Sequence, residues 1–192
     1  ESKLFYIPNI IHKSVPIGKN EKDNIVVKEW GEKPKFSFTP LSHLEIGEKF
    51  NLFNFKNSVK MAGSGFPLYI GLGARLERSL INYMLDFHIS NNKYTELMPP
   101  VLANYDAMKN TGQLPKFEDD MYNIPQDNLY CIPTAEVPVT NMHQKDILNE
   151  SDLPIKYAAY SSCFRREAGS YGKDTKGLNR LHQFNKVELV KF

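Results

Sequence analysis

The clearest pattern in this chain is a run of apolar side chains at helical spacing, which predicts a helix over residues 74–90. Its apolar face consists of Leu76, Leu80, Tyr83, Met84 and Phe87, widened by Ile81, Leu85 and His88. The polar stripe opposite consists of Arg75, Arg78, Asn82 and Asp86. An apolar face this wide indicates burial on two sides, whereas periodicity alone favours a helix sunk in a single core.

Alternating and β-branched runs predict strands over residues 24–30, 94–102, 130–133, 155–168 and 183–192. Two consecutive prolines, Pro99 and Pro100, should stop regular pairing in the second of these. A short helix, a break at Gly112 and an acidic loop are expected within residues 104–120. Residues 41–63 show a mixed pattern, in which these side chains are expected to be buried: Leu44, Phe50, Leu52, Phe53 and Phe55.

A turn at residues 133–136 precedes a helix that is expected to run to about Lys145. Thr134 is suited to cap this helix, and Glu136 is favoured near its start by the helix dipole. Pro138 is tolerated in a first turn. From the residues alone, a helix start is the simpler interpretation of this turn.

The last two predicted strands form a long-looped antiparallel hairpin, because glycines punctuate the linker between them. Side chains alternate along a strand, so Arg165 and Glu167 share one face of the first arm. Phe184, Lys186 and Glu188 share one face of the return arm. If the register brings these faces together, one surface combines a guanidinium, two carboxylates and an aromatic ring. That combination suits a ligand with a phosphate, an amine and a flat base.

Composition and charge narrow the class of protein. At 192 residues and 41% hydrophobic content, the chain can form a domain with its own core. The net charge is only +2, yet residues 164–192 hold seven basic residues against three acidic ones, so positive charge is local. The loop bearing Lys173, Lys176 and Arg180 could fold over an anionic ligand, and the alternative is a solvated hairpin tip with ordinary surface lysines.

Several kinds of site find no support in the sequence. Cys131 and Cys163 form no C-x-x-C pair and the five histidines are scattered, so no metal site is predicted. Reduced thiols in a cytoplasmic protein are expected. No apolar run approaches the roughly 20 residues of a membrane span, and no signal peptide opens the chain.

Two common phosphate-binding motifs fail on inspection. Lys173 follows a glycine as in a Walker A loop, but Asp174 stands where serine or threonine is required. Gly71 and Gly73 begin a dinucleotide fingerprint whose sixth position is Leu76. A nucleotide would therefore bind on a sheet face, with arginine.

Residues 164–167 (Phe-Arg-Arg-Glu) and 180–184 (Arg-Leu-His-Gln-Phe), on either side of the glycine-rich loop, closely resemble motif 2 of class II aminoacyl-tRNA synthetases in its seryl-tRNA synthetase form. Further resemblances stand in the family's order: the start of the catalytic domain at 7–10 and 15–18, the end of motif 1 at 98–101, and the serine-binding loop at 133–136. The resemblance covers nearly the whole chain.

This resemblance implies an ATP-dependent serine–tRNA ligase and assigns roles to residues. Arg165 would be catalytic, bridging the serine carboxylate and the α-phosphate. The implied ATP-binding residues are Arg165, Arg166, Glu167, Leu181 and Phe184. The implied serine-binding residues are Thr134, Ala135, Glu136 and Glu188. Serine, ATP and tRNA(Ser) are the implied partners, and Mg²⁺ is an implied cofactor with ligands beyond residue 192.

Each of these roles has a structural alternative. Arg165 and Glu167 could form a cross-strand ion pair worth under about 1 kcal/mol when exposed. Phe184 could be a core residue. Arg166 points to the opposite strand face, where it would support the site or order the loop.

The resemblance also implies a fold and a domain arrangement. The expected fold is α+β, a class II synthetase-like antiparallel sheet flanked by helices and incomplete at the C-terminus. Residues 1–35 would lead into the catalytic domain and residues 36–192 would form its N-terminal part, with motif 1 at about 74–102 and motif 2 at about 161–192. Motif 1 in this family builds a homodimer interface.

The family's helical tRNA-binding arm and its motif 3 are not recognised in the chain, so we expect a fragment that is weakly active or inactive alone. Two other functions stay open. One is a synthetase-like ligase that loads an amino acid onto a carrier protein. The other is a non-catalytic module that dimerises or binds RNA through the basic loop.

Overall fold

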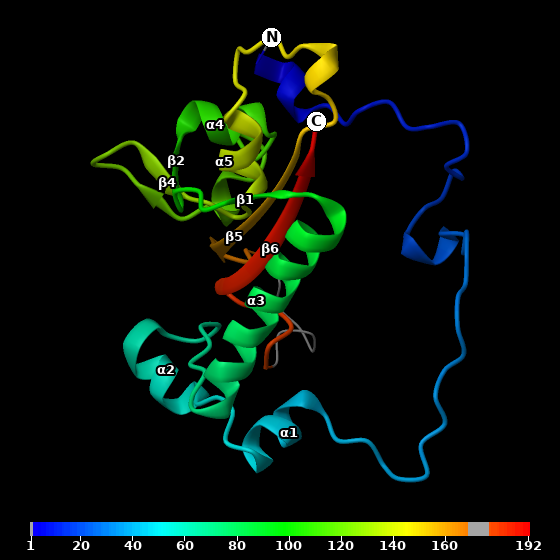
Figure 1. The fold of residues 1–192 in the computed structure, drawn as a ribbon, viewed down its shortest axis with the longest axis vertical. Coiled ribbons are helices and arrows are strands. Elements are labelled where there is room, and N and C mark those ends of the chain that lie inside the picture. Colours follow the sequence, from blue (N-terminus) through cyan, green and yellow to red (C-terminus); the bar gives the residue numbers. More distant parts are fainter. Residues whose placement is uncertain (1, 169–176) are drawn as a thin grey trace. The chain divides into compact units, whose positions relative to one another are not determined.

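The computed structural model describes residues 2–168 and 177–192, and it divides into two compact units, Glu1–Leu41 and Ser42–Phe192. The elements of the first unit are the 3-10 helices η1 Ser2–Tyr6 and η2 Glu21–Asp23. Those of the second unit are α1 His43–Lys49, α2 Phe55–Ala62, α3 Leu72–Asn92, β1 Thr95–Leu97, β2 Leu102–Asn104, α4 Tyr105–Asn110, η3 Glu118–Asp120, β3 Asn123–Ile124, β4 Leu129–Cys131, α5 Glu136–Asn141, η4 Glu150–Asp152, β5 Lys156–Phe164 and β6 Gln183–Lys191. Figure 1 shows this course.

The strand predicted over residues 24–30 is wrong. No strand is assigned there, and Val27 is 90% exposed. β-Branched side chains favour a strand only where a second strand completes the hydrogen-bond ladder, and the described part of the first unit contains none.

The first sheet of the second unit has the strand order β1-β5-β6. β5 and β6 form the predicted antiparallel hairpin, with Lys156 opposite Lys191 at one end and Phe164 opposite Gln183 at the other. β1 runs parallel to β5. The expected α+β class, with antiparallel strands flanked by helices, is confirmed.

The single strand expected over residues 94–102 is instead two strands in different sheets. β1 ends at Leu97, and β2 begins at Leu102 and joins the second sheet, ordered β2-β4-β3. Pro99 and Pro100 lie between them, and a residue without a backbone N–H cannot continue a ladder. The chain therefore changes sheets at the prolines.

Two apolar clusters hold the second unit together. One lies among the second sheet, α4 and α5, and consists of Ala103, Met108, Leu114, Met121, Tyr130, Ile132 and Val137. The other packs α5 on the first sheet and contains Ala135, Val139 and Ala159. α5 therefore lies between the two sheets and contacts both clusters.

Helix α3 confirms the helix predicted over residues 74–90, extended by two residues at each end. It lies beside β5 and β6, contacting the first sheet through the buried Leu85 and a hydrogen bond from the Asn185 amide to the Glu77 carboxylate at 3.1 Å. Its predicted apolar face is exposed, so the alternative of a helix buried in a single core is wrong. The exposed side chains are Leu76, Leu80, Tyr83, Met84 and Phe87. Among the described residues, no helix has the length and apolar content to cross a membrane.

Residues 41–63, which showed only a mixed pattern, contain two helices. α1 starts at a capping box, in which the Ser42 hydroxyl accepts from the Glu45 N–H and the Glu45 carboxylate accepts from the Ser42 N–H. The side-chain oxygen of Asn54 caps α2. The expected burial is wrong for Phe50, which is exposed, while the other named apolar residues are partly buried.

The helix after the turn at residues 133–136 is shorter than expected. α5 ends at Asn141 rather than near Lys145, and Ala135 holds its N-cap position. The hydroxyl of Thr134 still accepts a hydrogen bond from the Glu136 N–H at 3.2 Å. Thr134 is therefore a turn residue whose hydroxyl bonds to the first N–H of the helix without holding the N-cap position.

Gly73, at the start of α3, provides a test of the packing. A Cβ added there would lie 1.8 Å from the backbone oxygen of Leu52, which accepts a hydrogen bond from Ile70. Gly73→Ala should lower the free energy of unfolding by about 1–3 kcal/mol, although Gly to Ala in an open helix normally stabilises. Urea unfolding measures this. Arg75→Ala, at an exposed position of the same helix, should change it by less than about 0.5 kcal/mol, and equal stability of wild type and Gly73→Ala would contradict the packing.

Candidate functional site

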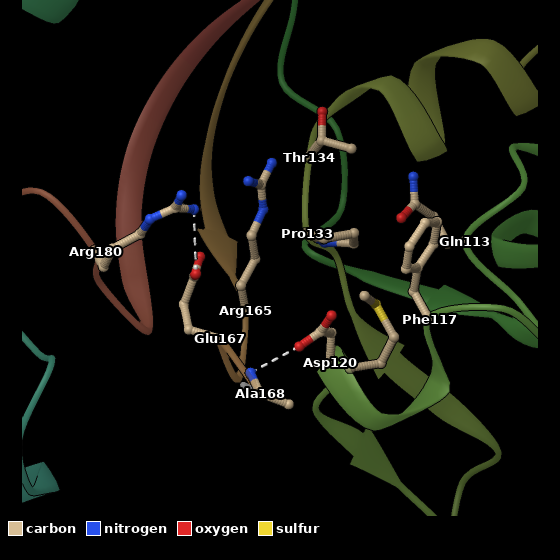
Figure 2. Close-up of a pocket in the computed structure, with 10 residues that line it drawn as sticks. Gln113, Phe117, Asp120, Pro133, Thr134, Arg165, Glu167, Ala168 and Arg180 are labelled. Atoms are coloured by element: carbon tan, nitrogen blue, oxygen red, sulfur yellow. Dashed lines mark hydrogen bonds and ion pairs between the residues drawn. The ribbon is translucent and has the colours of Figure 1, made fainter. Parts of the chain in front are cut away.

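A hollow of about 320 Å³ lies where the β5–β6 hairpin meets the turn at residues 133–136. Figure 2 shows its lining, which includes Asp120, Thr134, Arg165, Glu167, Ala168 and Arg180. The lining comes from segments far apart in the sequence, so only the folded chain assembles it.

Arg165 follows directly after β5 and is held there by its backbone, whose N–H donates to the carbonyl of His182 at 3.0 Å. Its guanidinium lies over the ring of Phe184, 5.1 Å from the ring centroid. In the described part of the chain no carboxylate forms an ion pair with this guanidinium. Figure 2 shows it extended toward Thr134, so its donors face the hollow.

The turn after Arg165 is held at several points. Asp120 accepts the backbone N–H of Arg166 on its carbonyl at 2.9 Å and that of Ala168 on its carboxylate at 2.8 Å. Glu167 has a φ of +51° and pairs with Arg180 at 3.4 Å. This conformation is uncommon for a residue with a side chain, and it turns the chain away from the strand.

A second group of polar side chains joins Thr134 to β6. The Thr134 hydroxyl donates to the Glu188 carboxylate at 2.7 Å, and the Lys186 ammonium donates to the Thr134 hydroxyl at 2.6 Å. Lys186 also forms an ion pair with Glu188. Since Lys186 and Glu188 are two residues apart, they share the strand face that carries Phe184.

Burial alone would raise the pKa of Glu188, but opposing interactions outweigh it. Hydrogen bonds from Lys186 and Thr134, and the charges of Lys186 and Arg165, hold the pKa of this carboxyl below its ordinary value. Glu188 is therefore an ionised acceptor at neutral pH.

The structure brings together some of the predicted site residues and separates others. Thr134, Arg165 and Glu167 line the hollow, while Phe184 and Glu188 lie beside it, each in contact with a lining residue. The remaining ones do not line it: Arg166, whose guanidinium lies 5.7 Å from the Tyr122 ring centroid, the buried Leu181 and Ala135, and the exposed Glu136. Lys173 and Lys176 lie outside the described residues.

The residues that support the hairpin were not predicted from the sequence. His182 is hydrogen-bonded to the Tyr122 hydroxyl at 2.6 Å, stacks on Phe66, and donates its backbone N–H to Gly65 at 2.7 Å. A Cβ on Gly65 would lie 2.2 Å from the His182 ring. A glycine such as Gly65 can mark a close approach between two segments, and this was the available sequence signal. The sequence alone does not show that His182 is the residue that approaches it.

Comparison with known proteins agrees with the geometry of the site. A family model described as the tRNA synthetase class II core domain (G, H, P, S and T) matches residues 116–192, which include both arms of the hairpin and the lining of the hollow except Gln113. Serine–tRNA ligases of Geobacter sp. strain M21 and Bacillus subtilis strain 168 are 58% and 55% identical to this chain over 189 residues each.

Solved structures give the same result. The seryl-tRNA synthetase from Pyrococcus horikoshii, in complex with ATP, aligns with a TM-score of 0.90 at 35% identity, over 98% of this chain and 46% of that one. The cytoplasmic serine–tRNA ligase of Naegleria fowleri, with AMP, aligns with a TM-score of 0.86 at 32% identity, over 98% and 45%. This chain belongs to the seryl-tRNA synthetase family. The two bacterial alignments include 98% of this chain. The chain spans only 45% and 44% of the length of those relatives.

Two pairs of side chains stand at or beside the hollow. Arg165 with Phe184 presents a cation and a ring, and Thr134 with Glu188 presents a hydroxyl and a carboxylate. The first pair suits a phosphate and a base, and the second suits hydrogen-bond donors.

The lowered pKa of Glu188 predicts a pH-dependent contribution to stability. A carboxyl that is more acidic in the folded chain stabilises it above the ordinary pKa of 4.5, and this stabilisation is lost as pH falls through the lower folded-state pKa. Wild type should therefore lose more unfolding free energy than Glu188→Gln between about pH 5 and pH 3. Urea unfolding at both pH values tests this, and parallel losses in the two proteins would contradict the assignment.

Proposed function

We propose that this chain supplies part of the active site of an ATP-dependent serine–tRNA ligase, which activates serine as seryl-adenylate and transfers it to tRNA(Ser). The observation that carries the proposal is the Arg165 guanidinium, which stands at the hollow over Phe184 without a carboxylate partner in the described residues. A buried or half-buried cation of this kind attracts an anionic ligand.

Amino-acid activation explains why such a cation is needed. The reaction joins a carboxylate to the α-phosphate of ATP and releases pyrophosphate, so two anions approach and negative charge grows at phosphorus. Fixed donors that are already oriented lower this barrier. Arg165 is proposed as the catalytic residue because a planar guanidinium can donate to both anions at once.

ATP is proposed to bind along the hairpin, at Arg165, Arg166, Glu167, Leu181 and Phe184. Phe184 would stack on the adenine, Leu181 would provide backbone contacts, and Arg166 would support the turn from the opposite face. The complexes of two structural relatives with ATP and AMP favour this proposal. Mg²⁺ would neutralise phosphate charge, but the described residues contain no cluster of three His, Cys, Asp or Glu side chains that could hold a metal ion, and no step is assigned to the metal.

Serine is proposed to bind at Thr134, Ala135, Glu136 and Glu188. Glu188 would accept from the serine amine or hydroxyl. A buried acceptor built for a hydroxyl also rejects alanine, because the acceptor would then be left unpaired. Thr134 is only 5% exposed, and its hydroxyl donates a hydrogen bond to Glu188. This contact supports a shared role of the two residues in serine binding.

The proposed role in aminoacylation also gives partners and a location. tRNA(Ser) is the proposed acceptor, and the cytoplasm is the proposed compartment. The relatives reported above are serine–tRNA ligases or seryl-tRNA synthetases by name, so they give no support to a carrier-protein ligase or a non-catalytic module.

A homodimer through α3 and the following strand is proposed from the exposed apolar face of the helix. Five large apolar side chains on one helix face water in the single chain. Contiguous exposed apolar surface of this kind is typical of a protein–protein contact. A second copy of the chain is the proposed partner, as the motif 1 resemblance implies.

Arg165→Ala tests the catalytic proposal. In the complete protein, serine-dependent pyrophosphate exchange into ATP should fall by about 100-fold or more, because an oriented donor at the developing charge is lost. Arg166→Ala is the matched comparison and should cost less than about tenfold, since its guanidinium lies over Tyr122. Unchanged exchange in Arg165→Ala would remove this residue from the mechanism.

Leu80→Glu tests the dimer. Leu80 is 47% exposed in the centre of the apolar face of α3, so a carboxylate there should be buried in the interface and should convert the protein to a monomer in sedimentation velocity. Asp86→Ala, on the polar stripe of the same helix, should leave the dimer intact. A monomeric wild type, or a Leu80→Glu variant that sediments as the wild-type dimer, would contradict the proposal.

A further inference from the structure

Lys186 lies at the centre of the proposed serine-binding group, yet no role has been given to it above. Its ammonium donates to Thr134 at 2.6 Å and pairs with Glu188, and its side chain is 30% exposed. A lysine on a strand normally extends into water. Here it is turned along the strand face onto the two groups that would receive serine.

The hydrogen bonds of Thr134 show what Lys186 does within this group. A hydroxyl has one proton and can accept two hydrogen bonds. The oxygen of Thr134 accepts from the Lys186 ammonium and from the Glu136 N–H, and its proton goes to Glu188. Because an ammonium can only donate, Lys186 fixes the direction of the Thr134–Glu188 hydrogen bond.

The carboxylate of Glu188 is constrained on one side only. Its contacts with Thr134 and Lys186 both involve Oε2, and among the described residues no hydrogen bond to Oε1 is found. Oε1 is therefore the oxygen with acceptor capacity left for a ligand. The charges around it are Lys186 and Arg165, so it is an acceptor in surroundings without net negative charge.

This arrangement bears on which ligand group the acceptor prefers. An unneutralised carboxylate attracts an ammonium more strongly than a hydroxyl, because the charge–charge energy is added to the hydrogen bond. A carboxylate already paired with an ammonium gains much less from a second one. Specificity is a difference between two affinities, and a built-in repulsion against the wrong ligand can create it.

We propose that Lys186 is a positioning and specificity-determining residue: its ammonium orients Thr134 and neutralises Glu188, so that the site accepts a ligand hydroxyl in preference to a second ammonium. The proposal rests on the proposed function, since it concerns the side chain of the amino acid that binds at Glu188. The alternative is that Lys186 is only a structural tie between β6 and the turn before α5.

The test compares L-serine with L-2,3-diaminopropionate, which has an amino group in place of the hydroxyl. Pyrophosphate exchange is measured for both in the complete protein, at about pH 6 so that the second amine carries a proton. In Lys186→Met the ratio of kcat/KM for serine to that for diaminopropionate should fall roughly tenfold or more. A structural tie would lower both values alike and leave the ratio unchanged.

Three further variants separate the contributions. Lys186→Gln keeps a donor for Thr134 without the charge, so its ratio of kcat/KM values should fall as that of Lys186→Met does. This variant also serves as the test if the methionine variant fails to fold. Lys186→Arg keeps the charge and should stay within about threefold of the wild-type ratio. Lys191→Met, on the opposite face of β6, should leave the ratio unchanged.

The outcomes are distinct from those of the proposed function. A wild type without serine-dependent exchange would overturn the proposed function and this proposal with it. Normal exchange in wild type, with equal ratios in wild type, Lys186→Met and Lys186→Gln, would overturn the role of Lys186 alone.

Discussion

The register of the β5–β6 hairpin is the constraint on which the site depends. Residue pairs in this antiparallel ladder bring the face of Arg165 together with the face of Phe184, Lys186 and Glu188. A slip by one residue would turn every side chain of one arm to the other face, toward α3. Mutual backbone hydrogen bonds between Ile155 and Phe192 close the far end, and the bond from Arg165 to His182 closes the near end. The position of the site therefore depends on the backbone pairing of the two arms.

The turn that carries the site is held by the elements that precede the sheet. His182 contacts Gly65, Phe66 and Tyr122, and the Nε2 of His43 accepts the backbone N–H of Leu178 at 3.1 Å. These segments lie before or between the strands and contain no residue of the proposed reaction. They keep the ends of the hairpin arms in place, so their importance comes from geometry rather than from chemistry.

Sequence patterns predicted the elements in which an apolar–polar pattern repeats over many residues. They failed where one partner strand or a pair of prolines determines whether a strand forms. The helix α3 and the hairpin arms have long periodic patterns, which local propensity and burial both favour. The segment 24–30 has strand-forming residues but no partner strand, and the strand predicted over 94–102 is divided between two sheets at two prolines. α1 was missed although Ser42 and Glu45 carry a capping-box signal, because its apolar periodicity is weak.

The candidate site divides in the same way. Alternation predicted that Phe184, Lys186 and Glu188 share a face of β6, and the resemblance supplied roles for Phe184 and Glu188. The strand predicted to run to residue 168 ends at Phe164, so Arg165 and Glu167 lie in the turn beyond β5, where alternation does not apply. What alternation could not provide was the pairing between charges. Lys186 was placed on the correct face, but its contacts with Thr134 and Glu188 depend on a turn more than 50 positions earlier in the chain, as the sequence separation of 52 shows for Lys186 and Thr134.

The pairing of charges on this face explains why Arg165 is available to a ligand. Two cations, Arg165 and Lys186, lie on the same strand face as the carboxylate of Glu188, and that carboxylate is ion-paired with Lys186. Another carboxylate of the described hairpin residues, Glu167, is paired with Arg180. Since Glu188 and Glu167 are ion-paired with other cations, the Arg165 guanidinium rests on the ring of Phe184, a contact weak enough for an anion to replace. Lys186 thus acts on both ligands: it shapes the acceptor for one and leaves the guanidinium open to the other.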